Sequence, residues 1–415
     1  MKSIYAIFIQ LLKWGFLVGS LFNRKIAQGN KGRSEAFERL RKSIGKNDKV
    51  IWMHAASLGE YEQGLPVLEL LKENYPNDKI LITFFSPSGF ENVLKKNRIA
   101  DVICYLPFDS KKDLAPFLDS MKIRLFYSVK YEYWYVLFEM LHKREVPVFI
   151  VSSLFYSEQI FFKNIGKWFA KRLAITVNWF FHQTSESFEL AKSIGLSNGS
   201  VSGDTRVDRV RLLSQTPVDI PIVAEFKSDS PLLVIGSSWA AEEEIAENLI
   251  KNDLDLKIVI APHDLGRVAQ LKTRLQNAVL YSEIENQNEV PRQGRVLIID
   301  SIGLLAHAYR YADLAVVGGG FHSKGLHNVL EAATYGVGVV IGNHFKKNPE
   351  AVNLIALKAI RDFSTPSEAA EFIANAFKDK SILEGMSKAS ASYFSSTQGA
   401  GKTVAEKIIQ MVDSL

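Results

Sequence analysis

Residues 314–331 read LAVVGGGFHSKGLHNVLE, and this stretch decides the fold of the chain. Four apolar residues end in three glycines, and a short loop leads to an amphipathic helix that we expect Asn328 to open. An apolar run, a glycine turn and a helix are typical of a parallel sheet covered by helices. Glycines let the backbone approach a ligand, and the N–H groups of a helix start favour a phosphate. Glu331 can accept hydrogen bonds from sugar hydroxyls, so the stretch predicts an α/β protein that binds a nucleotide through phosphate and ribose.

Short apolar runs alternate with helical stretches along the rest of the chain, which indicates two parallel sheets covered by helices. We expect strands at residues 50–53, 80–84, 125–128, 148–151 and 174–177, and a second series at 232–235, 257–260, 296–299, 314–317 and 337–341. Two Rossmann-like domains that face each other would bind a ligand at the carboxyl ends of their strands. The expected parts are residues 1–45 (a membrane-associating segment), 46–213 (first domain), 214–230 (linker) and 231–415 (second domain), with the option that the last helix packs back on the first domain.

The overall composition is that of a globular protein of two domains. The chain has 415 residues, of which 47% are hydrophobic and 23% charged, so large-scale disorder is not expected. Cys104 is the single cysteine, which excludes a disulfide within the chain. No two histidines stand four residues apart with a carboxylate beside them, so the sequence predicts no zinc site.

The amino-terminal region is apolar and then basic. Residues 4–22 read IYAIFIQLLKWGFLVGSLF, interrupted by Gln10, Lys13 and Ser20. A central lysine costs roughly 3 kcal/mol in a helix that spans a bilayer. We therefore expect a helix in the membrane interface, with the basic residues that follow near anionic head groups. The alternative is a core helix of the first domain followed by a solvated basic tail. Nucleic-acid binding is not expected, because the basic stretch lacks interleaved stacking aromatics.

Glu60 is the candidate general base. Residues 54–60 read HAASLGE and follow the strand expected at 50–53, so Glu60 lies on a strand-to-helix turn before a helix over 61–71. Gly59 permits a tight turn there, and Ser57 can cap the helix. Burial would raise the pKa of this carboxyl toward neutrality, as a base requires. The other interpretation is an acid that complements the helix dipole.

The whole series of motifs resembles the Kdo (3-deoxy-D-manno-octulosonate) transferases of lipopolysaccharide biosynthesis. The matching segments keep the order of that family: HAASLGE (54–60), FFSPSG (84–89), YLPFD (105–109), YEYW (131–134), GDTRVD (203–208), GSSW with three glutamates (236–244), DSIGL (300–304) and the opening stretch. Each motif is weak alone, but the set covers nearly the whole chain.

The resemblance implies an inverting glycosyltransferase of the GT-B type at the cytoplasmic face of the inner membrane. Its donor would be CMP-Kdo and its acceptor a lipid A precursor (lipid IVA), from whose hydroxyl Glu60 would take the proton. The leaving group carries one phosphate, so cations and backbone N–H groups can stabilise it, and we expect neither a metal nor another cofactor. An anionic membrane surface is the expected partner, with no obligate protein partner.

The resemblance also implies a CMP-Kdo site in the second domain. Asn328, Val329, Leu330 and Glu331 match its CMP-binding helix start, with Glu331 on the ribose, although Asn328 and Glu331 also fit a capping box. Further matching positions are Pro262, His263, Ile302, Gly303, Leu304 and Asn348. Ser237 and Ser238 can bind the sugar carboxylate or the phosphate, or else cap a helix. His263 stands where the family has Arg, so Arg267 or Lys324 would share its task.

Several positions depart from the family motifs. Lys130 stands where the family's ETELW motif has its first Glu. Glu132 is the acid that remains, either as a residue of the acceptor site or as a structural hydrogen-bond partner. Leu304 replaces a Glu, and residues 151–155 lack the family's Arg. Residues 253–255 spell D-x-D, but they precede a strand at the end away from the expected cleft, which favours a surface turn.

Other functions fit part of the pattern. Another GT-B nucleotide-sugar transferase or a UDP-sugar epimerase would share the glycines and the ribose acid. An NAD-dependent oxidoreductase would place its glycines after the first strand of a domain, whereas here they come late. A catalytically inactive scaffold would not need Glu60 and Glu331.

Overall fold

The computed structural model describes residues 2–96, 99–164, 166–252, 254–275, 277–287, 290, 294–323 and 325–415. The chain forms two compact units. Unit 1 consists of residues 1–209 and 399–415, and unit 2 consists of residues 210–398. Asp253 of the D-x-D sequence and Lys324 lie outside the described residues.

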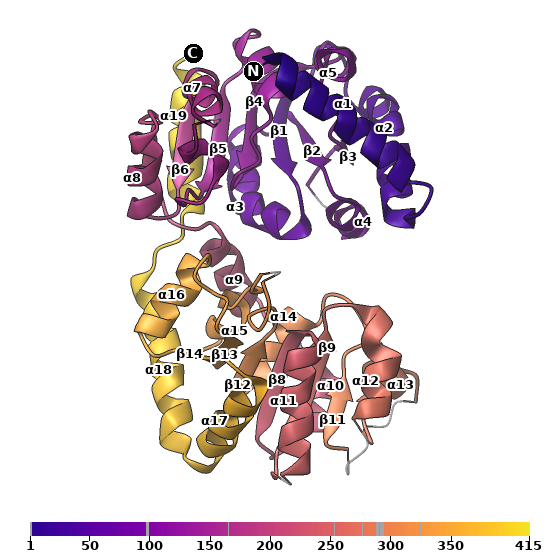
Figure 1. Cartoon of the computed structure of the whole chain (residues 1–415), viewed down its shortest axis with the longest axis vertical. Helices are drawn as coiled ribbons and strands as arrows, with labels where there is room; N and C mark the ends of the chain where they lie inside the picture. Colours follow the sequence, from indigo (N-terminus) through magenta and orange to yellow (C-terminus); the bar gives the residue numbers. More distant parts are fainter. Residues whose placement is uncertain are drawn as a thin grey trace. The chain divides into compact units, whose positions relative to one another are not determined.

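Unit 1 contains a seven-stranded sheet in the order β3-β2-β1-β4-β5-β6-β7, and all of its paired strands are parallel (Figure 1). The order reverses between β1 and β4, which is the place where open parallel sheets bind ligands. The strands are β1 (Lys49–Ala55), β2 (Lys79–Phe84), β3 (Val102–Tyr105), β4 (Lys122–Val129), β5 (Val148–Ser153), β6 (Trp179–His182) and β7 (Gly199–Val201).

Helices cover both faces of this sheet, which explains why its strands are apolar on both sides. One face packs against α2 (Arg24–Ser43), α5 (Lys111–Leu118), α6 (Tyr135–His142), α7 (Lys167–Thr176) and α8 (Ser185–Ser193). The other packs against α3 (Leu58–Asn74), α4 (Pro87–Lys96) and the carboxyl-terminal helix α19 (Gly401–Asp413). Asp208 accepts a hydrogen bond from the Gly401 N–H at 2.9 Å, which ties the start of α19 to unit 1.

Unit 2 contains a second seven-stranded parallel sheet in the order β10-β11-β9-β8-β12-β13-β14, which reverses between β8 and β12. Its strands are β8 (Leu232–Ser238), β9 (Lys257–Pro262), β10 (Val279–Leu280), β11 (Val296–Ile298), β12 (Leu314–Val317), β13 (Gly338–Gly342) and β14 (Ile360–Phe363). One face is covered by α11 (Ala240–Lys251), α12 (Val268–Arg274), α17 (Pro366–Lys378) and Met386 of α18 (Lys380–Ser396). The helix α9 (Arg206–Gln215) begins in unit 1 and ends in unit 2. The other helices of unit 2 are α10 (Pro221–Lys227), α13 (Tyr281–Gln287), α14 (Leu305–Ala308), α15 (Leu330–Ala333) and α16 (Pro349–Ala356).

The strand expected at residues 174–177 is wrong, because these residues end α7 and the next strand is β6. Ala170, Leu173 and Thr176 are buried at a helical spacing, whereas Ile175 is exposed, so the run is amphipathic with a helical period. The expected linker, residues 214–230, contains α10, whose Val223 and Phe226 are buried.

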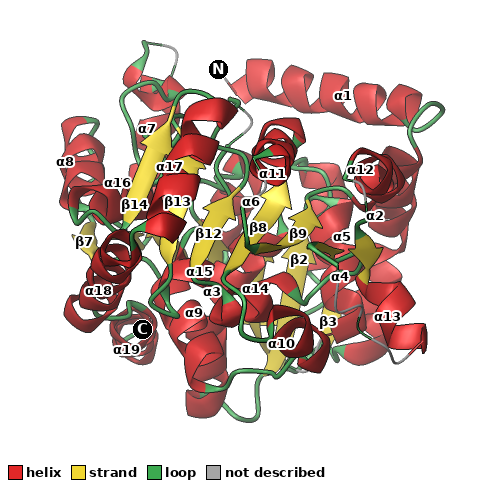
Figure 2. Ribbon diagram, turned by 90° about the horizontal axis from the view of Figure 1, so that it is seen from below, coloured by secondary structure: helices red, strands yellow, loops and turns green. Residues whose placement is uncertain are grey.

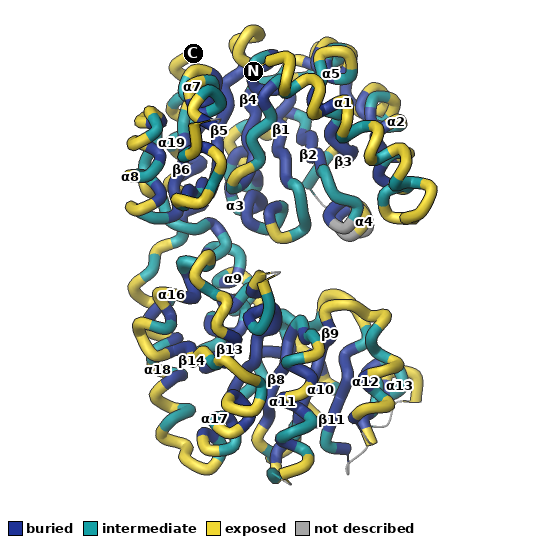
Figure 3. Tube along the Cα trace, in the orientation of Figure 1, coloured by how far each residue is buried: buried dark blue, intermediate teal, exposed yellow. Residues whose placement is uncertain are grey.

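The first helix, α1 (Lys2–Gly19), lies on the surface of unit 1 beside α2 (Figures 1 and 2). Its polar groups anchor it: the Tyr5 hydroxyl donates to Asp109 at 2.5 Å, and Lys13 forms an ion pair with Asp113. Figure 3 shows the rest of α1 as largely exposed, in contrast to the strands. Large apolar side chains make up the exposed face: Ile4, Ile7, Phe8, Leu11, Trp14, Leu17 and Val18. None of the helices in the described residues is long and apolar enough to cross a membrane.

Candidate functional site

Glu60 lies in the first turn of α3, directly after β1. The helix begins at Leu58, three residues earlier than expected, because Ser57 caps it. The Glu60 Oε2 atom accepts the backbone N–H groups of Ala56 (2.6 Å) and Ser57 (3.0 Å), which completes a capping box. The same carboxylate oxygen thus accepts both of these hydrogen bonds. A Cβ atom on Gly59 would meet no atom within 4 Å, so packing inside unit 1 does not require a glycine there.

The environment of Glu60 raises its pKa to about 7. Burial is the largest cause, since the residue is 7% exposed, and the negative charge of Glu132 adds to it. Lys130 and the two backbone N–H groups act in the opposite direction. Glu60 is therefore both a helix cap and a carboxylate that can take up a proton near neutral pH. Its role as the general base stays a prediction.

Glu132 follows β4, the strand beside β1, and its carboxylate lies 3.8 Å from Nε2 of the buried His54. The other ring nitrogen of His54 lies 2.9 Å from the Thr83 hydroxyl and 3.1 Å from the Thr83 carbonyl. Trp52 donates to the same hydroxyl at 2.8 Å. The side chains of β1 and β2 thus hold His54 in place beside Glu132. Both acids named from the sequence, Glu60 and Glu132, lie at the point where the strand order of unit 1 reverses.

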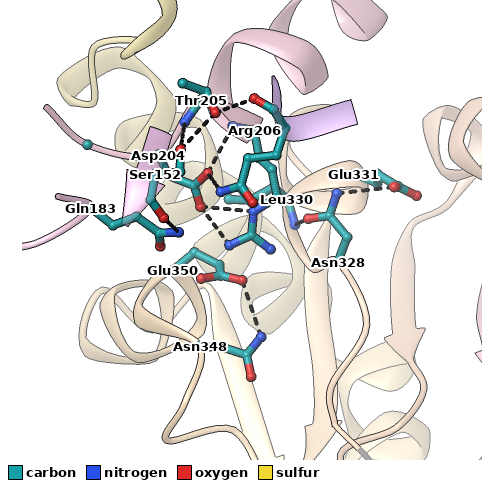
Figure 4. Close-up of polar contacts among 12 residues, drawn as sticks. Ser152, Gln183, Asp204, Thr205, Arg206, Asn328, Leu330, Glu331, Asn348 and Glu350 are labelled. Carbon is teal, nitrogen blue, oxygen red and sulfur yellow. Dashed lines mark hydrogen bonds and ion pairs between the residues drawn. The ribbon is translucent and has the colours of Figure 1, made fainter. Parts of the chain in front are cut away.

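A half-buried ion pair in unit 1 shares Lys130 with this group. Asp204 accepts hydrogen bonds from Arg206 (2.6 and 2.9 Å) and from Gln63 (2.6 Å), as Figure 4 shows for Arg206. Burial alone would raise the pKa of Asp204, but the Arg206 guanidinium lowers it overall, and Lys130 contributes in the same direction. Lys130 has a left-handed backbone (φ 61°) and lowers the pKa of both Glu60 and Asp204, so its ammonium serves two carboxylates.

In unit 2 the candidate residues gather where the strand order reverses between β8 and β12. Ser237 and Ser238 end β8, Pro262 ends β9 with His263 directly after it, and Gly318 follows β12. Ser237 has a left-handed backbone (φ 52°), and a Cβ atom on Gly318 would lie 2.0 Å from the Ser237 carbonyl oxygen. The close approach of these two turns therefore requires glycine at position 318.

The helix expected to open at Asn328 is a single turn, α15, which begins at Leu330. It ends early because Gly336 has a left-handed backbone (φ 73°). Asn328 makes no capping box. Its side-chain oxygen accepts the Leu330 N–H at 3.2 Å, and its amide donates to Glu331 at 3.1 Å (Figure 4). Val329 is buried, so the polar atoms of this segment come from Asn328 and Glu331.

The other predicted positions of unit 2 lie on neighbouring turns. Ile302 is exposed, Gly303 has φ 105°, and the Leu304 carbonyl accepts the first hydrogen bonds of α14. Asn348 precedes α16 and donates to Glu350 at 3.4 Å (Figure 4). The Arg267 guanidinium forms two hydrogen bonds with Glu243 at 2.6 and 2.9 Å, and its sharing of the task of His263 stays a prediction.

His54, Asp204, Arg206 and Trp239 were not predicted as site residues. Asp204 and Trp239 each follow a strand, and this position at a strand end was the available signal in the sequence. His54 lies inside β1, and its proximity to Glu132 depends on the pairing of β1 with β4.

Comparisons with known proteins match this chain to one family. Residues 31–209 match the family described as 3-deoxy-D-manno-octulosonic-acid transferase (kdotransferase). A 3-deoxy-D-manno-octulosonic acid transferase from Aquifex aeolicus is 26% identical over 310 residues, which cover 73% of this chain and 78% of that protein. A bifunctional glycosyltransferase/methyltransferase from Fusobacterium nucleatum is 26% identical over 327 residues. That match covers 76% of this chain and 50% of the length of the relative.

Solved structures with the same fold include a UDP-GlcNAc 2-epimerase from Neisseria meningitidis bound to UDP-GlcNAc. It is 16% identical, with a TM-score of 0.60, and the match covers 87% of this chain and 100% of that chain. At this identity, the likeness concerns the fold: an α/β protein with two parallel sheets.

Proposed function

We propose that this chain, a glycosyltransferase of the Kdo transferase family, transfers Kdo from CMP-Kdo to a lipid A precursor (lipid IVA) with inversion at the anomeric carbon. The observation that supports this mechanism best is the buried Glu60 at the carboxyl end of β1, with its pKa raised to about 7. The proposed arrangement is of the GT-B type, with the acceptor on unit 1 and the donor on unit 2. We propose no metal in the reaction.

In the proposed reaction, Glu60 takes the proton of an acceptor hydroxyl as its oxygen attacks the anomeric carbon of Kdo. The bond from that carbon to the CMP phosphate oxygen breaks, and CMP leaves on the opposite face. A carboxyl with a pKa near 7 is half ionised at neutral pH, which suits it to accept a proton and release it again. Glu132 supports this role, because its charge raises the pKa of Glu60.

Unit 2 supplies the proposed site for CMP. Glu331, held by the Asn328 amide, would accept the ribose hydroxyls. The turns that carry Ser237, His263 and Asn348 would contact the phosphate and the Kdo carboxylate. The backbone of residues 302–304 would surround the cytosine.

A product assay tests the proposal. The purified chain, CMP-Kdo and lipid IVA should yield a lipid heavier by one or more Kdo residues in mass spectrometry, with the anomeric configuration inverted by NMR. The same chain with UDP-N-acetylglucosamine should release no UDP. Release of UDP without transfer of Kdo would favour the epimerase-like alternative and contradict the proposal.

We further propose that α1 places the enzyme on the anionic cytoplasmic face of the inner membrane. Lys13 faces unit 1 through its ion pair with Asp113, so the lysine that interrupts the apolar run does not interrupt the exposed face. Large apolar side chains on that face, such as Trp14 (61% exposed), can enter the lipid interface, while the basic residues of α2 lie near the head groups.

A charge on the exposed face of α1 should release the protein from lipid. Phe8→Glu combined with Trp14→Glu should lower the bound fraction in sedimentation with anionic phosphatidylglycerol vesicles by about tenfold or more, since each change removes apolar burial and adds repulsion. Leu357→Glu, on an exposed leucine of unit 2, is the matched control and should leave binding unchanged. Equal binding of all three proteins would contradict the role of α1.

A further inference from the structure

Three histidines and a tryptophan form one aromatic cluster in unit 2. The rings of His263 and Trp239 stack with centroids 4.6 Å apart and planes inclined by 22°. The His322 ring lies perpendicular to Trp239 with centroids 4.9 Å apart, and the His327 ring lies 4.6 Å from that of His263. The cluster therefore joins the turns that follow β8, β9 and β12, at the reversal of the strand order.

Backbone contacts hold these turns together. The His263 N–H donates to the Ser238 carbonyl at 3.0 Å, and the His327 N–H donates to the Gly318 carbonyl at 3.0 Å. Gly319 has φ 93°, and a Cβ atom there would lie 2.2 Å from the Gly325 carbonyl oxygen and 3.2 Å from the His327 ring. The glycine turn after β12 thus brings His327 against the cluster.

A buried hydroxyl adjoins the cluster. Ser238 ends β8 directly before Trp239 and is paired with Pro262 of β9. It is fully buried, and its Oγ atom has no hydrogen-bond partner within the described residues. A buried hydroxyl normally has a partner, so one without a partner points to a ligand atom that completes its bonding. A hydroxyl next to imidazoles suits a phosphate or carboxylate oxygen.

The charged groups around the cluster are already paired or bonded to the backbone. Glu243 of α11 forms ion pairs with Arg267, at 2.6 Å, and with Arg274 of α12, at 3.0 Å. Glu242 of α11 accepts the N–H groups of Trp239 (2.8 Å) and Gly319 (3.0 Å). Asp264, beside His263, accepts the Gly266 N–H at 2.9 Å. The imidazoles are therefore the groups in this set that can gain a positive charge when an anion binds.

We propose that His263, His322 and His327 form a proton-dependent anion subsite that takes the phosphate of the donor nucleotide. The inference rests on the proposed function, because that function makes the ligand a cytidine phosphate. His263, His322 and His327 come from the turns after β9 and β12, so the subsite joins the two neighbours of the central strand β8. A proton taken from solvent onto the imidazole cluster supplies the positive charge that the bound phosphate needs.

The surroundings of the cluster determine whether its affinity for an anion rises or falls with pH. Burial, and then the neighbouring His263 and His322, lower the pKa of His327 to about 4, so His327 is neutral at pH 7 when no anion is bound. A bound anion raises the pKa of the imidazoles that it contacts, because it stabilises their charged form. Anion binding therefore takes up protons, and affinity falls by up to about tenfold per pH unit as the pH rises through the pKa of the liganded cluster.

Calorimetric titration of the full chain with cytidine 5′-(methyl phosphate) tests the subsite, since this diester keeps a single charge over the whole pH range. The Kd should rise about tenfold between about pH 6 and about pH 8. Titrations in two buffers of different ionisation enthalpy should show proton uptake on binding. Uncharged cytidine should bind with no such pH dependence. His263→Arg supplies a permanent charge and should flatten the pH dependence, and His322→Gln should weaken diester binding at low pH.

The titrations distinguish failure of the proposed subsite from failure of the donor assignment. A diester Kd that changes less than about twofold over this range, without proton uptake by the wild-type protein, overturns the subsite and leaves the donor assignment standing. Failure of CMP, cytidine and the diester to bind at any pH overturns the donor assignment and the subsite with it. The wild-type measurement of proton uptake needs no variant, so misfolding of a variant cannot obscure the result.

Discussion

Glu60→Gln is expected to lower kcat by about 10²- to 10⁴-fold, the usual contribution of a general base. The amide cannot accept the hydroxyl proton, but its oxygen can still accept the N–H groups of Ala56 and Ser57 that Glu60 binds now. The Kd for CMP should stay within about threefold, because the proposed CMP residues belong to unit 2. The measurements are the rate of Kdo transfer and calorimetric binding of CMP.

Glu73→Gln, on an exposed position of the same helix, is the matched control and should retain full activity. The fold of the Glu60 variant can be checked by its melting temperature. Because the pKa of Glu60 is raised from 4.5 to about 7, its contribution to stability is lost as the pH rises through about 7. The variant should therefore melt above the wild type at alkaline pH and converge with it near pH 4.5. Retained turnover in a folded variant would defeat the assignment of the base.

The pH profile gives a second readout of the same site. The acid limb of kcat/KM should lie near pH 7, where Glu60 ionises. Glu132→Gln removes a charge that raises this pKa, so the limb should move to lower pH. An acid limb that stays in place while activity falls would mean that Glu132 serves the acceptor directly and does not tune Glu60.

Glu331→Ala should raise the Kd for CMP by about 10- to 100-fold, since hydrogen bonds to a charged group contribute about 1.5–3 kcal/mol. The Asn328 amide donates to the Glu331 carboxylate and orients it. If the lost bonds go to the ribose, the penalty should vanish with 2′,3′-dideoxy-CMP, which the wild type and the variant should bind equally. Calorimetric titration of both nucleotides into both proteins measures this.

Glu331→Gln, which keeps the acceptor oxygen and removes the charge, should lie between the wild type and the alanine variant. Glu371→Gln, at an exposed position of α17 in the same unit, is the matched control and should leave both affinities unchanged. An equal loss of affinity for CMP and its dideoxy analogue in Glu331→Ala would contradict the ribose contact and assign Glu331 a structural role.

Local sequence patterns predicted most of the sheet strands, because a strand buried on both faces is a continuous apolar run whatever its neighbours are. Leu314–Val317 and Val50–Met53 are such runs, and both are central strands. The run at 174–177 has the same composition but belongs to a helix, since its apolar residues pack with helical spacing on α7. The early end of α15 depended on a left-handed Gly336, which the capping pattern at Asn328 and Glu331 did not indicate.

Motif order within the chain was sufficient to predict the match to the kdotransferase family. Glu60 lies five residues after the end of β1, whereas Glu331 lies on the single turn of α15, well beyond the end of β12, and the roles of both residues stay predictions. The order of motifs did not predict contacts between segments that are far apart in the sequence. The pKa of Glu60 depends on Glu132 and Lys130, which the pairing of β1 with β4 brings beside it. Arg267 is occupied by Glu243, and His263 meets Trp239 and His327, because the order of β9, β8 and β12 aligns their turns. Charge interactions weaken with distance in space, and ring contacts need rings a few ångströms apart. Both therefore depend on which strands are neighbours in the sheet, and not on separation along the chain.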